Sequence, residues 1–121
     1  MKKVQKIIFS CVLLCVVFLL AGNVKKAEAS IVLDPGHDAS HTGANANGVA
    51  EEVVNLKIAQ YCYEELQKYE GVGQVYMTRN GEGCPYPGTT STQCNKKRVE
   101  FSKAVGAVMY VSFHNNSSSS S

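Results

Sequence analysis

Two histidines and one glutamate in this sequence have the chemistry and the spacing that suit a metal site. His37 follows a short apolar run that ends in Asp-Pro-Gly, and His114 directly follows another apolar run late in the chain. Glu51 opens a segment with helical periodicity. Two imidazoles and one carboxylate are the ligand set of a catalytic zinc, which keeps a fourth position for water. Zinc lowers the pKa of that water to about 7, so hydroxide forms at neutral pH.

Each of these residues also has an ordinary structural explanation. A single histidine after a strand is more often a capping or surface residue than a ligand. Acids are common in the first turn of a helix, where negative charge suits the helix dipole, and helical spacing does not distinguish Glu51 from Glu52. The metal hypothesis depends on both histidines falling at predicted strand ends with a carboxylate nearby. His41 lies in a loop with no strand to position it, and we expect it to be exposed to solvent.

The segments that must position these residues alternate between strand and helix patterns. Short apolar runs predict strands at residues 30–33, 75–78 and 107–111. Apolar residues at three- and four-residue steps predict a helix that starts at Glu51 and a second over residues 95–105. Alternating strands and helices imply parallel strands joined by right-handed crossovers. The predicted fold class is therefore α/β with a mostly parallel sheet.

The first 29 residues have the pattern of a secretory signal peptide. A lysine-rich start precedes the uncharged apolar run Ile7–Leu20, and Ala27-Glu28-Ala29 matches the small-x-small pattern that signal peptidase reads. We expect cleavage before Ser30. The run is shorter than the ~20 residues of a membrane-spanning helix, so an uncleaved anchor is the less favoured alternative. We expect no membrane span in the exported chain.

The exported part has a composition that excludes nucleic-acid binding. Residues 30–121 keep seven basic and nine acidic residues, a net charge of −2, and contain no basic patch. Residues 30–116 predict one domain, and residues 117–121 are a serine run typical of a flexible linker.

Three cysteines remain after signal cleavage. Cys84 and Cys94 flank an irregular loop rich in Gly, Pro and Thr, and we expect a disulfide to close that loop in an exported protein. Cys62 is interpreted as a residue on a helix face. The absence of a CxxC pair argues against a zinc site made of cysteines.

Five short segments, in this order along the chain, form a pattern that is more specific than the separate motifs. They are Ile31–His37 (IVLDPGH), Gly48–Glu51 with Asn55-Leu56, Thr78-Arg79, Arg98, and Val111–Asn116 (VSFHNN). A DPGH strand end joined to a later S-x-H strand end is a specific combination. Through these segments, over nearly all of residues 31–116, the chain resembles the zinc-dependent N-acetylmuramoyl-L-alanine amidases, a family of bacterial cell-wall hydrolases.

The resemblance implies a zinc site made by His37, Glu51 and His114. It selects Glu51 over Glu52, because the family's acid follows the glycine, here Gly48, by three residues. It also implies helices on both faces of the sheet, a location outside the cell or in the cell wall, and peptidoglycan as the partner. The implied reaction is hydrolysis of the amide between N-acetylmuramic acid and L-alanine. We expect the chain to act as a monomer.

Two features depart from the family's pattern. The loop between the second strand and the second helix is longer than the family's usual connection. The family's late glutamate, the general acid and base, has no counterpart in this sequence and is expected beyond Ser121. We assign its role to none of Asp34, Glu52 and Glu100. Because general acid–base catalysis contributes about 10²–10⁴-fold, we expect this partial catalytic domain, truncated after the third strand, to be inactive or impaired.

Two other functions stay open. A non-catalytic module could hold zinc and bind peptidoglycan without cutting it. A stop codon directly after Ser121 would favour that module, whereas a continuing reading frame with a late glutamate would favour the enzyme.

A cysteine peptidase could pair Cys62 or Cys94 with a histidine. Neither cysteine is predicted at a helix N-terminus, which would lower its pKa, so the peptidase is the less favoured alternative.

Overall fold

The computed structural model describes residues 29–116, so the predicted signal peptide, apart from its last residue, and the serine tail lie outside the described part. The strands are β1 (Ala29–Pro35), β2 (Asn45–Ala46), β3 (Val49–Ala50), β4 (Val72–Met77) and β5 (Met109–Phe113), and the helices are α2 (Glu51–Leu66) and α3 (Ser91–Ala104).

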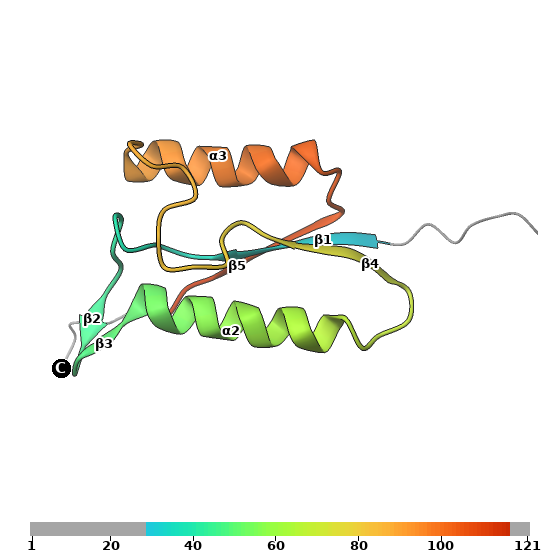
Figure 1. Cartoon of the computed structure of the whole chain (residues 1–121), viewed down its shortest axis with the longest axis horizontal. Helices are drawn as coiled ribbons and strands as arrows, with labels where there is room; N and C mark the ends of the chain where they lie inside the picture. Colours follow the sequence, from blue (N-terminus) through green and yellow to red (C-terminus); the bar gives the residue numbers. More distant parts are fainter. Residues whose placement is uncertain (1–28, 117–121) are drawn as a thin grey trace, which may run out of the picture.

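Three parallel strands form the central sheet, in the order β4-β1-β5. Helix α3 lies over one face of this sheet and α2 over the other, and the strand ends point toward the small β2–β3 hairpin (Figure 1). The predicted α/β fold, with a parallel sheet and helices on both faces, is confirmed.

The core forms where the central strand meets α2. Strand β1 is covered on both faces, so it needs a continuous apolar run, and Val32 and Leu33 are fully buried. Leu56 and Ala59, one turn apart on α2, pack below the sheet, and Val75 of β4 is also buried. The apolar periodicity of the first helix therefore identifies its buried face.

The second helix begins earlier than the sequence predicted, at Ser91 instead of residue 95. Thr90 caps it: its hydroxyl accepts from the backbone N–H of Gln93, while the Gln93 side chain accepts from the N–H of Thr90, at 3.3 and 2.9 Å. This T-x-x-Q capping box was the missed signal. The expected apolar position Val99 is 40% exposed, and the buried positions are instead Cys94, Arg98 and Ser102.

Strand bounds also differ by a few residues. Strand β4 begins at Val72 rather than residue 75, and β5 covers Met109–Phe113 rather than residues 107–111, so His114 follows it directly.

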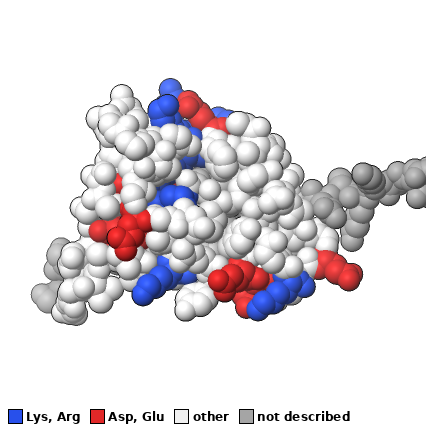
Figure 2. All heavy atoms as spheres, viewed as in Figure 1, with Lys and Arg blue, Asp and Glu red and all other residues white. Residues whose placement is uncertain are grey.

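Charges of both signs are mixed over the visible surface. Figure 2 shows basic and acidic side chains interspersed along the edge formed by α2, with no large single-sign patch on this face of the described residues.

Within residues 29–116, no helix has the length and apolar character needed to cross a membrane.

Candidate metal centre

The two predicted histidine ligands lie side by side because their strands are neighbours. Pro35 of β1 pairs with Phe113 of β5, so the chain leaves both strands at the same edge of the sheet. His37 and His114 follow there, with ring centroids 4.8 Å apart and ring planes at 81°. Helix α2 begins at this edge with Glu51.

Glu51 faces both histidines. Its Oε1 lies 3.6 Å from Nε2 of His37 and 3.1 Å from Nδ1 of His114. Zinc ligands about 2.1 Å from the ion at tetrahedral angles are separated by about 3.4 Å, so these spacings fit one metal ion. The structure thus brings the three predicted residues together, with one donor atom from each within 4.8 Å of the others.

Two glycines allow this close approach. A Cβ on Gly36 would lie 2.6 Å from the carbonyl oxygen of Phe113 and would collide with the His114 ring. A Cβ on Gly43 would lie 2.7 Å from Cδ2 of His37 and would also collide with Glu51. Any larger residue at either position would displace a histidine.

The tautomer of His37 is set by its neighbour in the loop. Its Nδ1 lies 3.2 Å from the carbonyl oxygen of His41, which can only accept, so Nδ1 carries the proton. The lone pair of Nε2 therefore points toward Glu51. A backbone carbonyl that orients a histidine in this way is a common support for a metal ligand.

Glu51 is held as an anion. The residue is 6% exposed, and burial alone would raise its pKa. Hydrogen bonds from the backbone N–H groups of Ala44 and Asn115 and from the side chains of His114 and Asn55 outweigh burial and lower the pKa to about 2. The carboxylate is charged at neutral pH and can serve as an anionic ligand.

Two buried arginines fix the loop that carries His37. Arg98, from α3, donates to the carbonyls of Pro35 at 2.7 Å and His37 at 3.1 Å. Arg79, after β4, donates to the carbonyls of Pro35 at 3.0 Å and Gly36 at 3.2 Å. His37 has a positive φ of 60°, a conformation that non-glycine residues seldom adopt, and these bonds hold it.

Asp34 joins β1 to its neighbours below this loop. It accepts hydrogen bonds from Thr78, Arg98, Tyr110 and Ser112. Burial would raise its pKa, but the hydrogen bonds from Thr78, Tyr110 and Arg98 lower it. The segments Thr78-Arg79 and Arg98 thus support the site, a role that could not be assigned from the sequence.

The prediction that His41 is exposed to solvent is wrong. Its side chain is 14% exposed, its Nδ1 lies 3.1 Å from both carboxylate oxygens of Asp38, and its Nε2 lies 2.8 Å from the carbonyl oxygen of Thr89. The bond to Asp38 raises the pKa of His41. The long loop before α3 packs over His41, a contact between segments far apart in the sequence.

The other acids near the centre have partners of their own. Glu52 accepts from the N–H of Gly43 at 3.2 Å, and Asp34 and Asp38 are bound to Arg98 and its neighbours. Glu100 lies on α3 and pairs with Lys96 at 3.9 Å. Each of these described acids therefore has a hydrogen-bond or ion-pair partner.

Comparison with known proteins identifies the family. A family profile described as N-acetylmuramoyl-L-alanine amidase matches residues 31–121. The chain belongs to this family. A search of curated proteins gives no match.

Solved amidase structures share the fold. One is the CwlD amidase from Clostridioides difficile in complex with the GerS lipoprotein, with 26% identity and a TM-score of 0.62 over 77% of this chain and 51% of that one. Another is the amidase AmiC2 of Nostoc punctiforme, with 29% identity and a TM-score of 0.63 over 78% and 48%. An amidase from Clostridium difficile 630, at 24% identity, shares the fold with a TM-score of 0.65 over 78% and 48%. The chain spans about half the length of these relatives.

Proposed function

We propose that this chain is the amino-terminal part of a zinc-dependent amidase of the cell wall. Its substrate is the amide that joins N-acetylmuramic acid to L-alanine in peptidoglycan, and it acts outside the cell as a monomer. The observation that carries the proposal is the convergence of His37, Glu51 and His114 at one sheet edge, in a chain that belongs to the amidase family.

The three residues divide the work of holding the cation. His37 would offer Nε2, and Glu51 would supply the negative charge. His114 would offer Nδ1, with the cation in place of the proton that this atom shares with Glu51. Bound zinc provides Lewis-acid polarisation of the scissile carbonyl and a low-pKa water. Arg79 and Arg98 act as positioning residues, because they bind the backbone carbonyls of Gly36 and His37, respectively.

Beside Glu51 lies a hollow suited to part of the substrate. It has a volume of about 250 Å³, and its lining includes Ala44, Val49, Val54, Asn115 and Asn116. We propose that the stem peptide lies here, with its methyl groups on the alanine and valines and its amides on the asparagines. This places the scissile bond next to the metal ligands.

The proton for the leaving amine must come from another group. The described acids near the cluster, Glu52, Asp34 and Asp38, are already hydrogen-bonded. We propose, as the family resemblance implies, that the acid that transfers this proton lies outside residues 29–116. Residues 29–116 without that acid should be slower by about 10²–10⁴-fold.

The test is release of new L-alanine amino termini from purified peptidoglycan. We expect a slow release that stops on chelation, returns with zinc and is absent in His114→Ala, while the control Cys62→Ser keeps the wild-type rate. The proposal would be contradicted if neither chelation nor His114→Ala changed the rate at which L-alanine amino termini are released. Zinc-dependent binding to peptidoglycan with no release would favour the alternative function, a non-catalytic module.

A further inference from the structure

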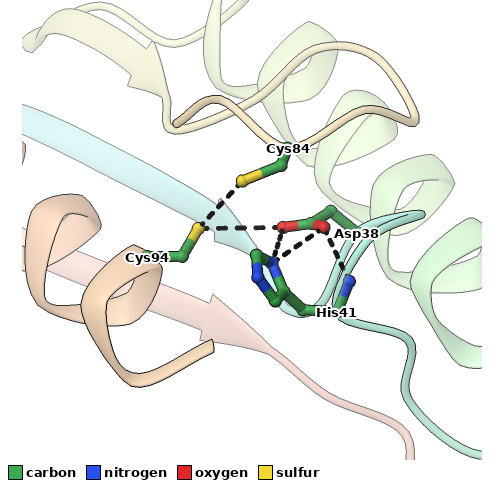
Figure 3. Close-up of side chains that lie close together, drawn as sticks. All are labelled: Asp38, His41, Cys84 and Cys94. Carbon is green, nitrogen blue, oxygen red and sulfur yellow. Dashed lines mark hydrogen bonds and ion pairs between the residues drawn. The ribbon is translucent and has the colours of Figure 1, made fainter. Parts of the chain in front are cut away.

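A second cluster of metal-binding side chains lies outside the candidate metal centre. Asp38 and His41 come from the loop after β1, Cys84 from the loop before α3, and Cys94 from the first turn of α3 (Figure 3). Asp38 and Cys94 are buried, and His41 and Cys84 are half-buried. One donor atom from each residue lies within 4.8 Å of the others.

Three of the distances between these atoms are within about 0.4 Å of those in a tetrahedral cation site. Zinc–sulfur bonds of about 2.3 Å and zinc–nitrogen or zinc–oxygen bonds of about 2.1 Å separate ligands by about 3.8 Å for S–S, 3.6 Å for S–O and 3.4 Å for N–O. Here Sγ of Cys84 and Sγ of Cys94 are 3.4 Å apart, and Cys94 Sγ is 3.7 Å from Asp38 Oδ2. His41 Nδ1 is 3.1 Å from Asp38 Oδ2.

The surroundings supply the supports that such a site needs. Nε2 of His41 faces the Thr89 carbonyl and must donate to it, so Nδ1 is the ring atom that faces the cluster. A cation bound there would take the place of the proton that Nδ1 shares with Asp38. Arg98 donates to Cys94 at 3.4 Å and to Asp38 at 2.8 Å. A divalent cation would balance the charge of two thiolates, while Arg98 is shared between the carboxylates of Asp38 and Asp34.

We propose that Asp38, His41, Cys84 and Cys94 bind a second, structural divalent cation of the thiophilic class, with zinc as the probe. The spacing of the cysteines argued against a cysteine zinc site, because no CxxC pair is present; folding brings in a histidine and an aspartate instead. The predicted disulfide is the rival: its bonded sulfurs would be about 2.05 Å apart, and both thiols are free in this structure. A disulfide would use two of the four residues, whereas a cation uses all four.

The second cation would also support the first site. The carbonyl of His41 accepts a hydrogen bond from Nδ1 of His37. His41 would thus bind the second cation through its ring and orient His37, a ligand of the first cation, through its backbone. Fixing His41 would thereby fix the orientation of His37.

The test measures zinc content and a cobalt spectrum of the chain purified under a thiol-free reductant. We expect two equivalents of zinc in the wild type and in Cys62→Ser, and one equivalent in Cys84→Ser. His114→Ala should lose the other equivalent. With cobalt(II), the wild type and His114→Ala should show an intense sulfur-to-metal charge-transfer absorption in the near ultraviolet, and Cys84→Ser should lack it.

The results separate the two metal sites. Failure of His114→Ala to lose an equivalent bears on the candidate metal centre alone. The second-site proposal is overturned if the folded wild type gives no charge-transfer absorption with cobalt(II), if Cys84→Ser retains two equivalents, or if Cys84 and Cys94 are found bridged in the reduced preparation. The wild-type spectrum tests the second site even if a cysteine variant fails to fold.

Discussion

Replacing Arg98 should destabilise the chain by about 3 kcal/mol. The residue is 1% exposed, and it pairs with Asp34 at 3.0 Å and with Asp38 at 2.8 Å. Arg98→Met keeps much of the side-chain volume but leaves two buried carboxylates without their cation. Removing one partner of a buried ion pair costs about 3–5 kcal/mol. We expect the lower end, because Asp34 keeps three hydroxyl donors and Asp38 keeps the N–H groups of Ser40 and His41.

The assay is urea unfolding followed by circular dichroism, with a chelator present so that metal binding does not add to stability. With an m-value of about 1.5 kcal/mol/M, the unfolding midpoint should fall by about 2 M. Arg98→Lys should recover only part of the loss, since one ammonium cannot reproduce the fork that reaches both carboxylates.

Lys96→Met is the matched control. It removes an exposed cation from the same helix, whose contact with Glu100 is 3.9 Å, and it should cost no more than about 0.5 kcal/mol. If the unfolding free energies of Arg98→Met and Lys96→Met differed by less than about 0.5 kcal/mol, Arg98 would not stabilise the carboxylates of Asp34 and Asp38 as described.

Three further outcomes follow from the same contacts. Gly36→Ala should lose zinc from the candidate metal centre, because the added Cβ collides with His114. The control Gly81→Ala, whose added Cβ meets open space, should keep its zinc, and metal analysis of both variants is the measurement. Adding zinc at 100 times its dissociation constant should stabilise the wild type by about 2.7 kcal/mol per site, and by one site less in His114→Ala, measured by thermal unfolding. The pKa of Asp34 is lower in the folded state than the unfolded value of 3.8. The stabilisation that the charged Asp34 gives is therefore complete above pH 3.8 and is lost as the pH falls below 3.8. Below pH 3.8 the unfolding free energy of Asp34→Asn should decline less than that of the wild type.

The fold and the cluster could be predicted because their signals are local. The apolar run of β1 and the periodicity of α2 are each visible within a few residues, and parallel strands place their carboxyl ends at one edge. The meeting of His37 and His114 could therefore be expected before the structure was known. The choice of Glu51 over Glu52 needed the family resemblance.

The polar interior could not be predicted, because its partners are far apart in the sequence. Arg98 and Asp34 are 64 residues apart, and a buried arginine on a helix otherwise resembles a solvated one. His41 was misjudged partly for the same reason: Asp38 is close to it in the sequence, but Thr89, from the loop that covers it, is 48 residues away. A buried polar group is recognisable only when the groups that satisfy it are known.

The proposed function depends above all on Glu51 binding the catalytic metal together with His37 and His114, and a comparison of the zinc content of Glu51→Gln and Glu52→Gln tests this. The two acids are neighbours in the first turn of α2, so the variants are matched in charge and in helix position. We predict that Glu51→Gln loses one equivalent of zinc relative to the wild type and that Glu52→Gln loses none. A folded Glu51→Gln that retains the full wild-type zinc content would show that Glu51 is not a ligand.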